Sequence, residues 1–176
     1  MTRTTCLLLF STTLLLTALD DAGNVGATSA VGFAATTVIS GKFGEIDLLH
    51  RIIILYSDEA DRRAKAWLSQ QKTSGPSDLY VQSNVWQPGG STGWHTHPGH
   101  SLIFVTAGTV TEYTGPGSDC KPHMYSEGMT FVDPHGDRAH IIRNEAKTVA
   151  RTIAVQIIPA DTARRIDVAD PGNCHF

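Results

Sequence analysis

Two histidines separated by a single residue are the strongest candidates for chemistry in this sequence. His95 and His97 stand just before the apolar run 102–105. In a β-strand, residues two apart point to the same face, so the two imidazoles can face one interior point. His140 lies in a later run rich in isoleucine and could bring a third imidazole from a neighbouring strand. Because imidazole is the commonest protein ligand for transition metals, we expect a site for one divalent ion, with Fe, Mn, Ni, Cu and Zn as candidates.

The residues around these histidines resemble the two sequence motifs of the cupin family. The first motif is a glycine, His-x-His, a glutamate and a second glycine, which here is Gly108. The second motif is matched, with one extra residue before the histidine, by Gly128, Pro134, Gly136, His140 and Asn144. The resemblance covers residues 78–158. It implies an antiparallel double-stranded β-helix, a jelly-roll barrel, that holds a metal through His95, His97 and His140.

One position departs from the cupin pattern. Ser101 stands where cupins usually carry the glutamate ligand. The centre would then resemble that of the three-histidine cupins, which include iron-dependent thiol and diketone dioxygenases. His100 is an alternative ligand, although it would need a bulge at residues 98–99 because it is out of phase with His95 and His97. The competing interpretation is that the three histidines are polar barrel residues without a metal.

Other polar residues near the motifs are weaker candidates. Ser101, His100, Tyr113, Asp133 and His135 could orient an imidazole or a bound water, although such residues more often occupy turns or the surface. Asn144 is expected to hold a turn rather than a substrate. No catalytic residue is assigned.

The resemblance leaves two functions open. The first is an exported metal-binding cupin that acts as an oxygen-dependent, dioxygenase-like oxidoreductase on a small organic molecule entering the barrel. The alternative is a non-catalytic module that binds or senses a small ligand or the metal itself. The sequence has no Gly-x-Ser-x-Gly elbow, phosphate-binding loop or dinucleotide fingerprint, which argues against serine hydrolase and nucleotide chemistry.

The first 30 residues resemble a secretory signal peptide. Arg3 precedes a mostly apolar stretch, residues 7–19, which is too short to span a bilayer. Small residues make cleavage plausible between 27 and 35. We therefore expect export to the periplasm or the exterior, with no membrane attachment after cleavage.

Cleavage would also remove Cys6 and leave Cys120 and Cys174 in an oxidising compartment, where a disulfide between them is the simplest hypothesis. A reactive Cys120 nucleophile is the alternative. Closing so long a loop would stabilise the fold by about 4 kcal/mol in the chain-entropy model, and mass spectrometry without reduction distinguishes the two alternatives.

The elements that must position the histidines are mainly strands. With 176 residues and a net charge of −3, the chain fits one domain, residues 36–176, and is not a basic nucleic-acid binder. Runs 38–40 and 45–55 predict opening strands, and short β-type runs separated by turns follow from residue 78. Apolar residues at helical spacing predict one short helix from Ser57 to about Gln71. Among cupins, pairing of outer strands often gives homodimers, and this is a further expectation.

Overall fold

The computed structural model describes residues 26–54, 65–117, 119–133 and 136–176, and every regular element in these ranges is a strand. The strands are β1 (Val31–Phe43), β2 (Asp47–Ile54), β3 (Lys65–Lys72), β4 (Ser77–Ser91), β5 (His95–His97), β6 (Ser101–Ala107), β7 (Thr109–Thr114), β8 (His123–Ser126), β9 (Thr130–Asp133), β10 (Gly136–Arg143), β11 (Ala150–Pro159) and β12 (Ile166–Asp167).

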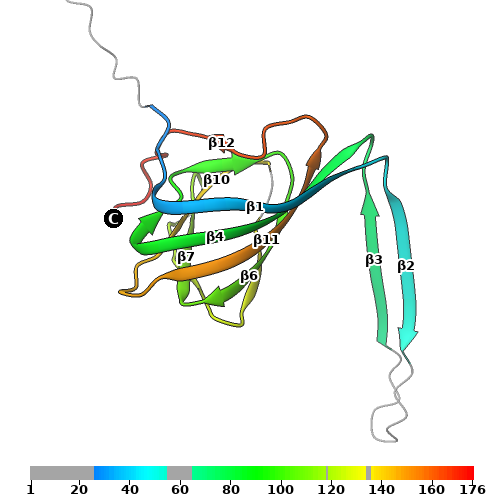
Figure 1. Ribbon diagram of the computed structural model, residues 1–176, viewed down its shortest axis with the longest axis horizontal. Coiled ribbons are helices and arrows are strands. Elements are labelled where there is room, and N and C mark those ends of the chain that lie inside the picture. Colours follow the sequence, from blue (N-terminus) through cyan, green and yellow to red (C-terminus); the bar gives the residue numbers. More distant parts are fainter. Residues whose placement is uncertain (1–25, 55–64, 118, 134–135) are drawn as a thin grey trace, which may run out of the picture.

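The strands form a nearly closed antiparallel barrel with two walls (Figure 1). One wall contains β1, β4, β11, β6 and β9, and the other contains β12, β5, β10, β7 and β8. The walls join where Arg143 of β10 pairs with Ser91 of β4. The predicted all-β jelly roll is therefore confirmed, as are the two opening strands. The first of these, β1, begins at Val31 and runs antiparallel to β4.

The inside of the barrel is polar at one end and apolar at the other. Along β6, the inward-facing Ser101, Ile103 and Val105 are buried, whereas Leu102 and Phe104 between them are exposed. This alternation is the period of two that places one side of a strand against a core. The apolar end is filled by Trp86, Ile103, Val105, Val110, Phe131, Ile142, Ala150 and Ala154. The histidines lie at the polar end.

A second apolar cluster lies outside the barrel, between the β5–β10–β7 wall and the C-terminal tail. Trp94, Tyr113 and Ile141 pack there with Cys174. Cys174 forms a disulfide with Cys120, with the two Cα atoms 5.5 Å apart. The predicted pairing is thus confirmed, and the alternative of a free Cys120 nucleophile is wrong. The tail is tied to the wall that carries all three of the histidines.

A buried asparagine, Asn144, holds the turn that follows β10. The Asn144 amide donates hydrogen bonds to the carbonyls of Trp86, Gln87 and Thr148, and its Oδ1 accepts one from the Ala146 amide. The side chain is fully buried. Its role is therefore to hold the turn, as predicted.

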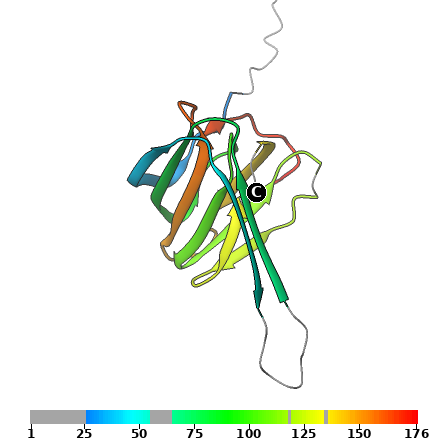
Figure 2. The same ribbon diagram turned by 90° about the vertical axis from the view of Figure 1, so that its right-hand side faces the viewer.

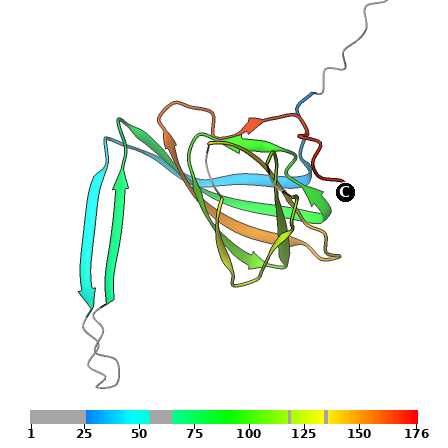
Figure 3. The same cartoon turned by 180° about the vertical axis from the view of Figure 1, so that it is seen from behind.

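The predicted helix is wrong where the structure can be compared with it. Residues 65–72 form β3, which pairs with β2 in a separate hairpin, and residues 57–64 lie outside the described part. The spacing of the apolar residues fits a helix, but pairing with the isoleucine-rich β2 satisfies the backbone instead, as tertiary context often does. Figures 2 and 3 show the hairpin projecting from the barrel. Its Leu49, Trp67 and Leu68 side chains are exposed.

The chain just before β1 also contacts the barrel. The Thr28 amide donates to the Val168 carbonyl at 2.9 Å, and the Thr28 hydroxyl accepts from the Trp94 amide at 2.6 Å. These contacts fall inside the predicted cleavage window. Residues 1–25 lie outside the described part, so the signal peptide stays a prediction. In the residues described, we find no helix with the length and apolar character needed to cross a membrane.

Candidate metal centre

Four side chains from three strands meet at the polar end of the barrel. They are His95 and His97 of β5, Asp133 at the end of β9 and His140 of β10, and one ligand atom of each lies within 4.8 Å of all the others. The strand register explains the convergence, because His140 pairs directly with His95. The structure therefore brings together the three predicted histidines and adds a carboxylate.

Backbone carbonyls hold the three imidazole rings in position. Nδ1 of His95 lies 2.9 Å from the Gly93 carbonyl, and Nδ1 of His97 lies 2.7 Å from the Arg164 carbonyl. Nδ1 of His140 contacts the Arg138 carbonyl at 3.4 Å. A carbonyl can only accept, so each Nδ1 carries the hydrogen and donates. When a ring is neutral, its Nε2 atom then has the lone pair that a cation binds, as is usual for metal-binding histidines.

Gly93 is suited to its place beside His95. Its φ of 69° lies in the left-handed region, which side chains other than glycine rarely adopt. A Cβ atom at this position would lie 2.6 Å from the Thr28 carbonyl oxygen. Because its carbonyl anchors His95, a substitution here would disturb that ring as well as the turn.

The Asp133 carboxylate lies between two of the imidazoles. Its Oδ2 is 3.2 Å from Nε2 of His97, and its Oδ1 is 3.1 Å from Nε2 of His140. Asp133 is also directly opposite Ser101 in the β6–β9 pairing. The carboxylate that position 101 lacks is thus provided by the adjacent strand, and the expected centre of three histidines without a carboxylate differs from the one observed.

The chemistry of this group fits a divalent cation. Among the described residues, Asp133 Oδ1 and His140 Nε2 are buried side-chain atoms without a hydrogen-bond partner, even though they lie close together. Buried polar atoms are normally paired, and an unpaired one is costly. Nitrogen and carboxylate ligands are those that Zn, Fe, Mn, Ni and Cu accept. A metal ion would satisfy both atoms at once.

Burial and charge give the groups of the centre different protonation behaviour. Burial lowers the pKa of His95 to about 2, helped by the nearby His140 and Arg165, so this ring is neutral at neutral pH. Burial also opposes charge on His140, but the Asp133 carboxylate outweighs it and raises the pKa of His140. The same contacts, with His140 and His97, lower the pKa of Asp133 well below its usual range despite its burial.

We therefore expect metal binding to displace a proton from His140. Because its pKa is raised, His140 stays protonated in and below the pH range in which histidine ordinarily titrates. It loses this proton only as the pH rises through the raised pKa. Below that value, metal affinity should fall about tenfold for each pH unit, with about one proton released per ion. Calorimetric titration with zinc at one pH, in buffers of different ionisation enthalpy, measures this number. A His123→Ala variant should release the same number of protons per ion. A heat of zinc binding that is the same in every buffer would contradict the expectation.

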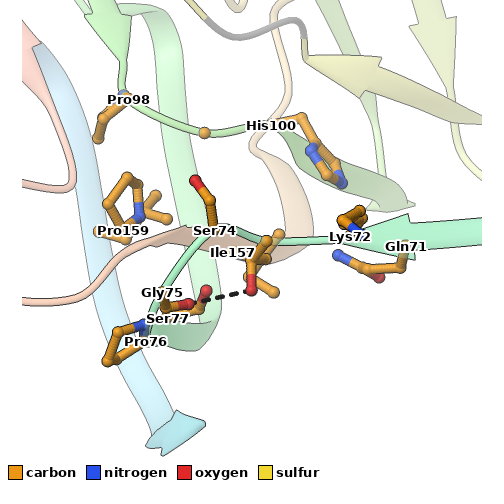
Figure 4. A pocket seen from close by; sticks show the side chains of 13 residues that line it. Gln71, Lys72, Ser74, Gly75, Pro76, Ser77, Pro98, His100, Ile157 and Pro159 are labelled. Atoms are coloured by element: carbon orange, nitrogen blue, oxygen red, sulfur yellow. Dashed lines mark hydrogen bonds between the residues drawn. The ribbon is translucent and has the colours of Figure 1, made fainter. Parts of the chain in front are cut away.

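The other predicted site residues lie in different places. Ser101 is buried and lines the same cavity as His95 and His97. His100 lies instead in an outer pocket of about 270 Å³ at the base of the β2–β3 hairpin, with Gln71 and Lys72 (Figure 4). The Tyr113 hydroxyl donates to Glu145 at 2.9 Å in the outer cluster, away from the centre. His135 lies outside the described residues.

One buried carboxylate near the centre was not identified from the sequence. Glu112 faces the barrel interior on β7, pairs with Ile142 and accepts a hydrogen bond from the Tyr125 hydroxyl. Burial raises its pKa, whereas the nearby His140 opposes the rise. The alternation Val110, Glu112, Thr114 along one face of β7 could have indicated it.

A cavity of about 70 Å³ adjoins the centre inside the barrel. Its lining includes His95, His97, Asp133 and Ser101 at one end. Arg165 also lines it, and its guanidinium donates to the Thr92 carbonyl and to the Asp167 carboxylate. A small molecule in this cavity would lie next to a bound metal.

Comparison with known proteins gives a family and several similar barrels. The sequence model of the cupin-domain family matches residues 84–156. Among solved structures, peruvianin-I, a cysteine peptidase from Thevetia peruviana latex, is 26% identical, with 52% of this chain and 56% of that chain covered and a TM-score of 0.43.

Two further solved structures are similar. An uncharacterized conserved protein with a double-stranded β-helix domain from Klebsiella pneumoniae is 18% identical, with coverage of 52% and 71% and a TM-score of 0.44. An oxalate oxidase is 24% identical, with coverage of 47% and 46% and a TM-score of 0.39.

This chain spans between 46% and 65% of the length of the first three structures that it matches. No curated protein sequence matches it. The matched segment runs from β4 to β11 and contains all four residues of the centre. The family match over residues 84–156 and the antiparallel barrel formed there together support a cupin domain in this part of the chain.

Proposed function

We propose that this protein is a metal-dependent cupin that binds one divalent transition metal through His95, His97, His140 and Asp133 and acts on a small molecule beside it. The observation that supports this most strongly is the convergence of four ligand atoms within 4.8 Å. The outward-facing nitrogens of the three rings are already committed to backbone carbonyls.

The residues of the centre would have different roles in binding the ion and holding protons. The three imidazoles hold the ion without adding charge, and Asp133 neutralises one of its two positive charges. When bound, a metal of this kind supplies Lewis-acid chemistry and, in the case of iron or copper, electron transfer with dioxygen. Glu112, whose pKa is raised by burial, is placed inside the barrel to hold a proton near the centre.

We further propose that the reaction is an oxygen-dependent oxidation of a small organic substrate. The buried setting supports this, because the cavity beside the centre is small and three of the four residues of the centre, His95, Asp133 and His140, are buried. A protein nucleophile is not needed for such chemistry. Export is part of the same proposal, supported by the apolar stretch of residues 7–19 and by the Cys120–Cys174 disulfide.

The direct test is elemental analysis of the protein purified without added metal or chelator. We expect close to one ion of iron, copper, manganese, nickel or zinc per chain in the wild type and none in a His95→Ala/His97→Ala variant. His100→Ala is the matched control and should keep its metal, because His100 lies in the outer pocket. A metal-free wild type, even after reconstitution, would reject the proposal. Bound metal without oxygen consumption across small substrates would leave a binding or sensing role in place of the oxidation.

A further inference from the structure

The β4 side of the cavity carries buried polar side chains with atoms that lack partners. Gln82, Asn84 and Trp86 alternate along β4 and line the cavity, and Gln156 of β11 lines it near the metal centre. Each is less than a tenth exposed. Within the described residues, Gln82 Nε2, Asn84 Oδ1, Trp86 Nε1 and Gln156 Oε1 have no hydrogen-bond partner. A buried polar atom without a partner costs about 1–3 kcal/mol, so four around one cavity indicate a ligand.

The hydrogen bonds that these side chains do make show which atoms remain available. The Asn84 amide nitrogen donates to the Thr152 hydroxyl at 3.2 Å, and that of Gln156 donates to the Arg164 carbonyl at 3.2 Å. Their oxygens are therefore left as acceptors. Gln82 Nε2 and Trp86 Nε1 are donors. A hydroxyl group both donates and accepts, so it can use atoms of both kinds.

The cavity admits only a short ligand. Strand pairing places Ala154 opposite Gln82 and Ala35 opposite Asn84, and these two small residues leave the available space. The volume of about 70 Å³ is well below the roughly 300–1,000 Å³ of pockets for drug-sized ligands. A ligand of a few non-hydrogen atoms fits this limit.

The metal end of the cavity carries a net positive charge when an ion is bound, because a divalent ion held by three neutral imidazoles and one carboxylate keeps a net charge of +1. Arg164 and Arg165 also line the cavity beside His95 and His97, and the Arg165 guanidinium is already paired with Asp167. This end therefore favours an anionic group, and a carboxylate is the simplest one that binds a divalent metal.

We propose that the cavity binds a short carboxylic acid that carries a hydroxyl group at the end remote from the carboxylate. The hydroxyl is held by Gln82, Asn84 and Trp86, and Gln156 contacts the ligand nearer the metal. The inference rests on the proposed function, because it names the substrate class of the same centre. The four polar side chains then determine ligand specificity, and their role is not purely structural.

The test compares two ligands of equal size on the zinc-loaded full chain. 3-Hydroxypropionate and butyrate have the same number of non-hydrogen atoms and differ in a hydroxyl against a methyl group. Calorimetry should show that 3-hydroxypropionate binds at least about tenfold more tightly, because a site built to pair a hydroxyl rejects the analogue without it. In Gln82→Met the preference should fall below about twofold, while zinc content stays that of the wild type. Ser83→Ala, which changes the neighbouring residue on the opposite face of β4, should keep the full preference.

Folding of the variant gives a second readout. Gln82→Met removes a buried amide nitrogen without a partner, so the melting temperature of the variant should equal or exceed that of the wild type. Equal affinity for the two acids, no binding of either, a preference that survives in Gln82→Met, or a variant that does not fold would each overturn the inference. If the wild type holds no zinc, the proposed function fails; the two acids are then compared on the metal-free chain, where the same hydroxyl preference decides the inference.

Discussion

Moving the carboxylate of the centre from position 133 to position 101 should preserve metal binding, whereas removing it should not. Asp133→Ser is expected to weaken zinc affinity by at least about a hundredfold, because a ligand is lost and the buried His140 loses its partner. Ser101 is buried and directly opposite Asp133, so a glutamate there can reach the same ion from the next strand. The Ser101→Glu/Asp133→Ser variant should recover most of the lost affinity. Competition titration with a chromogenic chelator measures all three proteins.

The control for this exchange is an acidic residue outside the barrel. Asp161 is exposed and pairs with Lys42, so Asp161→Ser should leave zinc affinity unchanged. A double variant no better than Asp133→Ser would show that the centre needs its carboxylate on β9 and would refute the exchange. Full affinity in Asp133→Ser alone would show that Asp133 is not a ligand.

Breaking the disulfide should cost stability and also loosen the metal centre. The bond closes a loop with a sequence separation of 54 residues, which corresponds to about 4 kcal/mol in the chain-entropy account. It also ties down the tail that follows Arg164, whose carbonyl orients His97, and β12, which pairs with β5. Cys174→Ser should therefore unfold at a clearly lower denaturant concentration than the wild type and bind zinc more weakly.

Reduction of the wild-type protein provides the matched comparison. Under a non-thiol reductant it should behave like Cys174→Ser in both measurements, and the reductant should not change the variant further. A reduced protein with unchanged unfolding midpoint and unchanged zinc affinity would show that packing of the tail against Trp94 and Tyr113 holds it without the bond.

The features predicted from the sequence were those carried by local patterns. The spacing of His95 and His97 fixes a shared face once the segment is a strand, and the alternation from residue 78 onward indicates many short strands. The cupin resemblance specified a jelly-roll barrel and supported His140 as the third ligand. The disulfide followed from the small number of cysteines. Export, homodimer formation and the position of signal cleavage stay predictions.

The features that the sequence left open depend on pairings between distant segments. Asp133 was only a weak candidate, because its value as a ligand depends on lying across from Ser101, a register that no local pattern reveals. Residues 65–72 carry helical spacing but pair with β2. In both cases a neighbour far along the chain decides the outcome. The unpartnered atoms of Gln82, Asn84 and Trp86 likewise become evident only when the barrel encloses them.

The support of β5 has a consequence for how this protein is made. This three-residue strand carries two of the four centre residues, and it is held by Thr28 before the barrel and by Arg164 and residues 166–168 after it. During synthesis, the last of these emerge well after β5 itself. The centre thus completes only after residue 168 has emerged, and the ions that compete for it are those present where residue 168 takes its place. For a chain exported before folding, metal identity would be set by the destination compartment rather than by the cytosol.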